Sequence, residues 1–281
     1  MNLLRSPTPA HPAQKPPAYE EPGAAGRAGN RATGSSVLEP APGNASERLG
    51  RHFGGRPPVL VFSLAVLAGY LLLVAAAIGL GFLLIDVLLP IHAIGHSDEA
   101  VNDWLAANRS SGLDDASYLG SSIGDIPFIP ALVIAVAVGA AIMRRWRIFA
   151  FVVGAILIEV ATYRVTSLVV HRDRPAVPRL DKLPVDQSYP SGHVAASIVV
   201  YVGLALLISS HLRSGTLKAL LWAFAILLPL AVAASRMYRG MHHPLDASAG
   251  VLIGLAAIAI ALFATRAAVE AARVRSGESR T

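Results

Sequence analysis

The sequence predicts an all-α protein: a polytopic membrane helical bundle with six transmembrane helices and a disordered N-terminal tail. Of its 281 residues, 54% are hydrophobic and only 15% are charged, whereas a soluble domain carries about 25% charged residues. The apolar residues gather in blocks of roughly 20, the length at which an α-helix crosses a hydrocarbon core of about 30 Å. The alternating apolar and polar pattern of a membrane-spanning strand is absent, so the spans are expected to be helices.

The N-terminal segment, residues 1–58, has a different composition. It contains ten of the 19 prolines, among Ala, Gly and Ser, without a periodic apolar pattern. Such a segment buries too little surface to offset the entropy of ordering, so we expect a disordered tail. It is not read as a secretory signal, because the first long apolar run begins near Val59 and is too long for one.

Six spans account for the apolar blocks, and the transmembrane domain is expected to cover residues 59–266, followed by a cytoplasmic tail at 267–281. The first span is overlong and is expected to tilt or to project from the bilayer. The fourth and fifth are short. The spans are expected at residues 60–89, 126–143, 148–170, 194–210, 217–234 and 247–265.

Basic residues divide unequally between the two faces of this bundle. Twelve lie on the face that holds both termini and seven on the opposite face. The positive-inside rule therefore predicts a multi-pass protein of the cell membrane with both termini in the cytoplasm and with loops 1, 3 and 5 outside. The formal net charge of +6 is scattered between apolar runs, which disfavours a nucleic-acid partner. The chain has no cysteine, so disulfides, thiolate zinc sites and cysteine nucleophiles are excluded.

Loops 3 and 5, on the same predicted face, hold an unusual share of the His, Arg and Asp residues. Ser191 is a good N-cap for the fourth span, and Gly192 removes the side chain that would block close approach to the first turn. Free N–H groups and the helix dipole would then form an anion cradle, with His193 beside it. The alternative is a capped helix start with an incidental histidine.

A second pattern joins His242 and Asp246, which are four residues apart. Pro244 suits the first turn of the sixth span, so the Asp246 carboxylate is expected to reach one ring nitrogen of His242. That bond would fix the tautomer and leave the other nitrogen as a nucleophile or base. The alternative is an aspartate that caps its own helix beside a loop histidine. His243 is expected to point elsewhere and is left out of the site.

Arg174 and Arg236 lie in the same outer segments, and each is a planar, permanently charged fork suited to phosphate oxygens. Taken singly, each is equally consistent with binding to lipid headgroups. A metal site at His193, His242 and Asp246 is chemically allowed, but it leaves the guanidinium groups without a role. Together the residues favour phosphoryl transfer through a phosphohistidine, with His242 attacking phosphorus and His193 protonating the leaving oxygen.

These segments resemble the three signature motifs of the type 2 phosphatidic acid phosphatase (PAP2) superfamily, which also includes vanadium haloperoxidases. The family pattern is Lys-x6-Arg-Pro, then Pro-Ser-Gly-His, then Ser-Arg-x5-His-x3-Asp. The second motif is matched by Pro190 to His193 and the third by Ser235, Arg236, His242 and Asp246. The first is matched by Arg174-Pro175, but its Lys position falls on Ser167.

The resemblance implies a membrane lipid phosphatase that uses no metal or other cofactor and removes a terminal phosphate from a lipid. It implies His242 as nucleophile, Asp246 as its orienting partner and His193 as acid and base. The phosphate binders that it implies are Arg174, Arg236, Ser191 and Gly192. Candidate substrates are polyprenyl diphosphates, which family analogy slightly favours, phosphatidate-like lipids and phosphatidylglycerol phosphate. The alternatives are a lipid phosphotransferase with the same intermediate and a non-catalytic phospholipid-binding or transport protein. Haloperoxidase chemistry is disfavoured, because an enzyme of that kind is expected to be soluble.

The missing lysine at Ser167 has a candidate replacement. Arg164 lies three residues earlier, on nearly the same helix face, and an ionisable residue inside a span is a candidate functional group. We therefore add Arg164 to the phosphate-binding residues as a hypothesis. The competing interpretation pairs Arg164 with Glu159 inside the bundle.

Overall fold

The computed structural model describes residues 36–125, 127–182 and 187–278, and all regular structure in these ranges is helical. Within these ranges, five helices are long and apolar enough to cross a membrane. They are the continuous run of α2 (Pro58–Phe82) and η2 (Leu83–Leu88), then α6 (Trp146–Val169), the run from α7 (Gly192–Ser197) through η3 (Ile198–Val202) to α8 (Gly203–Ser209), α9 (Gly215–Tyr238) and α10 (Pro244–Ser276). The remaining predicted span, the second in the chain at residues 126–143, is a shorter apolar helix of 15 residues, α5 (Phe128–Ile142).

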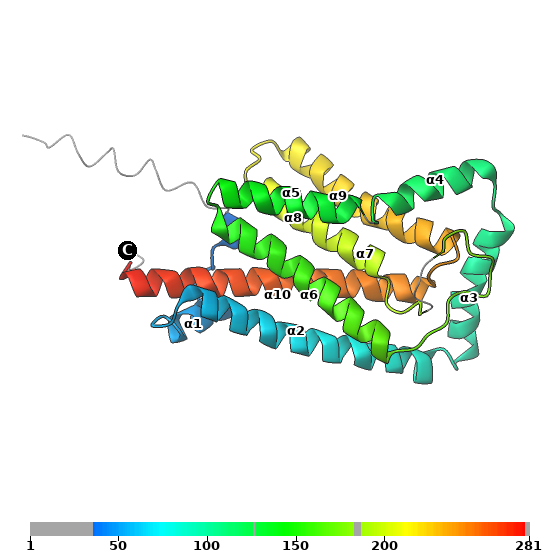
Figure 1. Ribbon diagram of the computed structural model, residues 1–281, viewed down its shortest axis with the longest axis horizontal. Coiled ribbons are helices and arrows are strands. Elements are labelled where there is room, and N and C mark those ends of the chain that lie inside the picture. The colour runs from blue at the N-terminus through cyan, green and yellow to red at the C-terminus, as the bar shows by residue number, and fades with distance from the viewer. Residues whose placement is uncertain (1–35, 126, 183–186, 279–281) are drawn as a thin grey trace, which may run out of the picture. The chain divides into compact units, whose positions relative to one another are not determined.

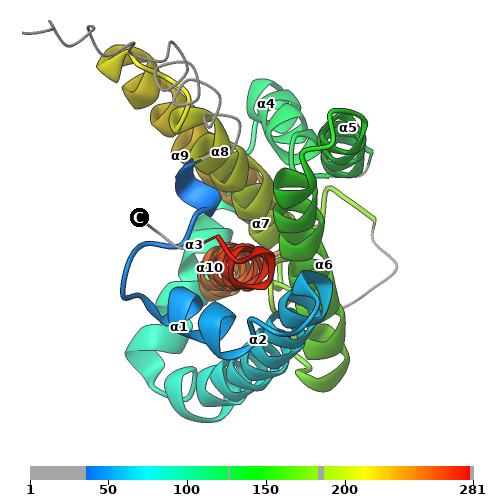
Figure 2. The same cartoon turned by 90° about the vertical axis from the view of Figure 1, so that its left-hand side faces the viewer.

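The long helix α10 lies at the centre of the bundle, where it contacts α1, α2, α6 and α7 (Figures 1 and 2). Small residues let its neighbours approach closely, as in other membrane helix pairs. A side chain on Gly250 would lie 2.5 Å from the Ser191 carbonyl oxygen, and one on Gly254 would lie 2.7 Å from that of Ala195. These two glycines therefore bring the start of α7 against the start of α10.

Two further helices cover the end of the bundle where α10 begins (Figure 1). They are α3 (His92–Ala107), which contacts α9 and α10, and α4 (Ser111–Ser122), which packs along α9. A side chain on Gly120 would lie 2.2 Å from Ser235 Oγ, so α4 approaches α9 closely. The sequence placed this segment in the first outer loop, and the two helices are an addition to that prediction.

The expected disordered tail needs a correction. Residues 1–35 lie outside the described residues, but residues 36–57 include η1 (Ser36–Leu38) and α1 (Ala45–His52). Asn44 Oδ1 caps α1 by accepting from Glu47 N at 2.8 Å. A side chain on Gly50 would lie 2.5 Å from the carbonyl oxygen of Ala267, so α1 packs closely on α10. Packing on a neighbouring helix stabilises a segment whose own composition does not. At the other end, α10 continues through the predicted boundary at residue 266 to Ser276.

Candidate active site

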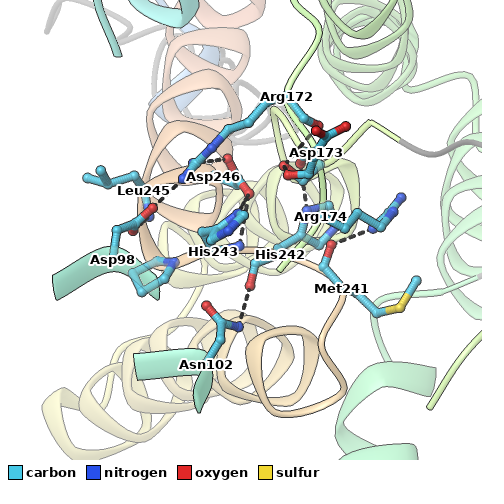
Figure 3. Close-up of polar contacts among 12 residues, drawn as sticks. Asp98, Asn102, Arg172, Asp173, Arg174, Met241, His242, His243, Leu245 and Asp246 are labelled. Carbon is cyan, nitrogen blue, oxygen red and sulfur yellow. Dashed lines mark hydrogen bonds and ion pairs between the residues drawn. The ribbon is translucent and has the colours of Figure 1, made fainter. Parts of the chain in front are cut away.

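The predicted site residues other than Arg164 lie at one end of the bundle, where α9 ends and α7 and α10 begin. Figure 3 shows Arg174, His242 and Asp246 among them. The Gly250 contact holds α7 against α10. Ser191 N also donates to the Asp246 carbonyl oxygen at 3.1 Å. The second and third sequence motifs therefore form one cluster.

His242 is buried in this cluster and has a defined ring orientation. Its Nδ1 lies 2.7 Å from the carbonyl oxygen of Ser188. Because a carbonyl only accepts, Nδ1 carries the proton and Nε2 of a neutral ring keeps its lone pair. Burial lowers the pKa of His242 well below its usual 6.5, and the nearby charges of Arg236 and Arg174 lower it further, against the opposing effect of Asp246. The ring is therefore neutral, as a nucleophile requires.

The predicted hydrogen bond between Asp246 and His242 is wrong. Asp246 Oδ2 instead accepts from the backbone N of His243 at 2.8 Å and lies 3.1 Å from its ring Nδ1. The physical reason is the position of the helix start: His243 is the N-cap of α10 and Asp246 is its third residue, so the carboxylate turns to the cap in a capping box. His243, which we left out of the site, is buried and contacts Asp246 directly.

Two guanidinium groups lie near His242. Arg236 is 1% exposed, and its Nη1 donates to Ser121 Oγ and to Asp181 Oδ2, both at 2.9 Å. Within the described part of the chain, its Nε and Nη2 are buried without a hydrogen-bond partner. Arg174 is also buried and donates from Nη1 to the Met241 carbonyl. Burial lowers the pKa of Arg174, and the charge of Arg236 lowers it further. The two buried guanidinium groups, Arg174 and Arg236, are expected to attract an anion strongly.

Ser191 and Gly192 lie at the start of α7, as predicted, but their contacts differ from those expected. Ser191 occupies the N-cap position without a capping hydrogen bond from its side chain. Its buried Oγ has no partner among the described residues, so this hydroxyl can serve a ligand. A side chain on Gly192 would lie 3.0 Å from the Tyr163 ring. A larger residue at this position would therefore require the Tyr163 ring to shift.

The next residue, His193, is also oriented by a contact that the sequence did not indicate. Its Nε2 lies 3.1 Å from Asp125 Oδ1, in the segment between α4 and α5. The charge of His193 acts on His242, which places both histidines in one electrostatic environment. The Asp125 carboxylate orients the ring, as an acid–base residue needs.

Helix α3 supplies three residues that the sequence analysis missed (Figure 3 labels two of them). Asn102 Nδ2 donates to the carbonyl oxygens of Met237 at 3.1 Å and His242 at 3.0 Å. Asp98 Oδ1 accepts from Leu245 N at 3.0 Å, and Glu99 Oε2 lies 2.8 Å from His243 Nε2. The backbone at His242 and on both sides of it is therefore held by α3.

A buried arginine completes this network. Arg172 bridges Asp98 and Asp246, with Nη1 at 2.5 Å from Asp246 Oδ1. Arg172 thus connects the 170–191 loop, α3 and α10. Its charge is compensated by two carboxylates, so it differs from Arg236, whose remaining nitrogens face no acceptor among the described residues.

Comparisons with known proteins agree with this arrangement of motifs. Residues 148–269 match the family model described as PAP2 superfamily. This part of the chain is therefore similar to the PAP2 superfamily. The match begins in α6 and ends in α10, so it includes Arg174, His193, Arg236 and His242, while α3 and Asp125 lie outside it.

Two curated proteins and one solved structure are similar to this chain. An undecaprenyl-diphosphatase of Sulfolobus acidocaldarius is 35% identical over 107 residues, which are 38% of this chain and 48% of that protein. The bacitracin transport permease protein BcrC of Bacillus licheniformis is 30% identical over 115 residues, 41% and 51% of the two chains. The chain thus spans about half the length of these curated relatives. A PAP2 type phosphatidylglycerolphosphate phosphatase from Bacillus subtilis has a TM-score of 0.56 at 22% identity and matches over 73% of this chain and 94% of its own. This chain and that solved structure therefore share a fold.

The lysine position of the first PAP2 motif holds Ser167, whose Oγ donates to the Arg164 carbonyl oxygen at 3.1 Å. Arg164 itself is exposed, and its guanidinium carbon lies 5.8 Å from the centre of the Tyr163 ring. The alternative ion pair between Arg164 and Glu159 is not formed in the described structure. Because the Tyr163 ring packs on Gly192, Arg164 lies next to a wall of the anion cradle and outside it.

Proposed function

We propose that this protein is an integral membrane lipid phosphatase that removes the terminal phosphate of a lipid phosphate or diphosphate. The observation that carries the proposal is the pairing of a buried, neutral His242 with a buried Arg236 that has two nitrogens available for an anion. A neutral imidazole nitrogen beside such a fork suits attack on phosphorus and stabilisation of the equatorial oxygens. The match of residues 148–269 to the PAP2 superfamily model supports the same chemistry.

In the proposed mechanism, His242 Nε2 attacks phosphorus while the bond to the leaving oxygen breaks. His193 gives its proton to that oxygen, and a phosphohistidine forms. Water then attacks the phosphohistidine, and His193 takes the water proton, so that phosphate is released and both histidines return to their starting states. Arg174, Arg236, Ser191 Oγ and the backbone amide of Gly192 stabilise the charge on the transferred group. Asp246 acts indirectly, because it holds His243 and Arg172 in place.

The proposed substrate class is a lipid with a phosphate or diphosphate headgroup, and a long polyprenyl diphosphate is the leading candidate. The bilayer buries the tail, so the site recognises the headgroup. The similarity to an undecaprenyl-diphosphatase supports this choice. The test is release of phosphate in detergent from polyprenyl diphosphate, phosphatidate and phosphatidylglycerol phosphate, with the intact protein beside its His242→Ala variant. Release from none of them, or equal release by both proteins, would overturn the proposal, and phosphate found on an added acceptor would indicate a phosphotransferase.

The site is proposed to face the extracytoplasmic side. The site residues lie where α10 begins, whereas the basic turn between α5 and α6 lies at the opposite end of the bundle, close to the end of α10 (Figure 1). The positive-inside rule places that basic end in the cytoplasm. A reporter fused after Thr281 tests this orientation: activity of a reporter that functions only outside would place the site in the cytoplasm.

The pKa of His242 is expected to set the acid limb of the pH profile of kcat/KM. Burial, Arg236 and Arg174 lower its pKa below 6.5, and only the neutral ring attacks phosphorus. Activity is therefore lost as pH falls through this lowered pKa, and the acid limb of kcat/KM is expected below pH 6.5. Arg174→Met removes one nearby positive charge and is expected to move the limb to higher pH. Arg213→Met, at the opposite end of the bundle, is the control and should leave it unmoved. A limb above pH 6.5 in the intact protein would contradict this account.

Asn102 is expected to position His242 without touching substrate. Asn102→Ala removes the donor to the His242 and Met237 carbonyls, and a shift of the nucleophile by about 1 Å costs about 100-fold in rate. We therefore expect kcat to fall about 10- to 100-fold while KM changes little. Asn108→Ala is the matched control, since Asn108 Nδ2 donates only to the exposed Trp104 carbonyl on the same helix. Equal kcat for the two variants would show that α3 does not position the nucleophile.

A comparison of Arg164→Ala with Arg174→Ala tests whether Arg164 supplies the positive charge that is missing at Ser167. If Arg164 supplies the charge missing at Ser167, Arg164→Ala should lower kcat/KM about tenfold, less than a buried donor would. Arg174→Ala, which removes a buried cation next to His242, is expected to cost more. Full turnover by Arg164→Ala together with loss by Arg174→Ala would refute the compensation.

A further inference from the structure

A large apolar groove lies in the half of the bundle away from the site. It has a volume of about 820 Å³ and is lined by the first half of α2, the first two thirds of α6 and the last third of α10. In Figure 1, α2 and α6 are close where α6 ends and separate toward the end where α10 finishes. The groove is lined by residues of both helices on that side. The floor is made by small side chains of α10, among them Thr265, Ala268 and Ala272.

The lining of the groove suits a hydrocarbon chain. Only Ser63, Tyr70, Arg147 and Thr265 bring polar side chains to it, among 20 lining residues. Thr265 Oγ1 already donates to the Ala261 carbonyl at 2.7 Å, so it adds little polarity. The volume lies within the range of small-molecule sites, roughly 300 to 1,000 Å³. Because both walls belong to candidate membrane spans, a lipid chain has direct access to the groove.

Four arginines lie among the lining residues, or within two residues of them in the sequence, where α2 and α6 begin. Arg147 lines the groove, Arg144 and Arg145 form the turn before α6, and Arg56 is two residues before Pro58. In the described ranges, only Arg147 of these four forms an ion pair, at 3.3 Å to a half-exposed Glu39. Arginine at this face is expected from the positive-inside rule alone. The apolar groove directly beside the arginines is what the rule does not explain.

We propose that the groove is a binding site for one anionic phospholipid, with an acyl chain between α2 and α6 and the phosphate at Arg147, Arg144 and Arg56. The arginine side chains match the charge of the headgroup, and the groove matches the chain. The bound lipid belongs to the leaflet opposite the proposed active site. The site is thus separate from the phosphate cluster at His242, and it does not depend on the proposed phosphatase activity.

Quenching of tryptophan fluorescence tests the proposal, because Trp146 lines the groove. A protein that keeps Trp146 and carries Trp104→Phe and Trp222→Phe is placed in phosphatidylcholine vesicles. Either phosphatidylglycerol or phosphatidylcholine with brominated acyl chains is then added in steps. We expect half of the quenching at a several-fold lower mole fraction of brominated phosphatidylglycerol. The matched control keeps only Trp222, half-buried on α9 and absent from the groove, and should show no preference.

Two variants separate the headgroup from the chain. Arg144→Gln with Arg147→Gln should reduce the preference for phosphatidylglycerol by about fivefold for each arginine. Ala150→Leu with Ala268→Leu fills the groove from half-buried positions and should weaken quenching by the anionic lipid while the protein stays folded. Equal quenching of Trp146 by the two lipids, or a preference that survives the arginine changes, would overturn the proposal. Absence of quenching by either lipid, with cross-linked dimers in the vesicles, would show that a second copy covers the groove.

Discussion

His242→Ala is expected to lower kcat for phosphate release by about 10⁴-fold or more, because no other side chain would carry the phosphoryl group. His242 is fixed on both sides, by the Ser188 carbonyl at its ring and by Asn102 at its backbone. The measurement is phosphate release in detergent from the preferred lipid phosphate. Trapping of an acid-labile phosphoenzyme in the intact protein, and its loss in the variant, identifies the step that fails.

Two neighbouring histidines serve as controls for this prediction. His171 is exposed, so His171→Ala should leave kcat unchanged. His243→Ala removes a contact of Asp246 and should lower kcat by much less than the loss of His242, since the nucleophile itself remains. If His243→Ala abolished the phosphoenzyme and His242→Ala did not, the assignment of the nucleophile would move by one residue.

The membrane spans could be predicted from the sequence because their signal is local. A run of about 20 apolar residues specifies a helix in a bilayer regardless of its neighbours. The ordered helix α1 was missed for the opposite reason. The cap of α1, Asn44 with Glu47, is visible in the sequence, but the Pro- and Gly-rich composition around it favoured the prediction of a disordered tail. The order of α1 depends on packing of Gly50 against α10, more than 200 residues away in the sequence.

The site was predicted only in part, because its local motifs could be recognised in the sequence and its contacts between distant residues could not. Motif spacing indicated His242, Arg236 and Ser191, because these residues carry recognisable chemistry at short separations. Asp98 and Asn102 reach the site only through folding, across 140 residues or more to Leu245 and His242. Their separation leaves no sequence pattern.

The prediction that Asp246 contacts His242 was wrong for a different reason: it depended on the residue at which the helix begins. Spacing of i and i+4 joins side chains only when both residues are helical. Because α10 begins at Pro244, His242 precedes the cap and Asp246 reaches His243 instead. A shift of two residues in the helix start therefore changes which histidine the carboxylate orients, and helix ends are the least predictable part of such a pattern.

Arg236→Lys is expected to lower kcat/KM by about 100- to 1,000-fold, although it keeps the positive charge. The guanidinium performs two tasks: Nη1 is held by Ser121 and Asp181, while Nε and Nη2 have no partner in the described structure. A lysine has one nitrogen, so it can pair with Asp181 or contact phosphate but cannot span both. Inhibition by orthovanadate, which imitates the transferred phosphoryl group, should weaken in parallel.

Arg239→Lys is the matched control for Arg236, because Arg239 lies in the next turn of the chain and shares Asp181. Its Nε and Nη2 already contact both carboxylate oxygens, at 2.6 to 2.9 Å. Its hydrogen bond to Asp181 raises the pKa of Arg239 despite partial burial. Arg239→Lys should therefore cost far less than Arg236→Lys and leave vanadate inhibition unchanged. Equal losses of kcat/KM in the two variants would mean that activity depends on the ion pairs with Asp181 and not on the Nε and Nη2 groups of Arg236 that are free in the described structure.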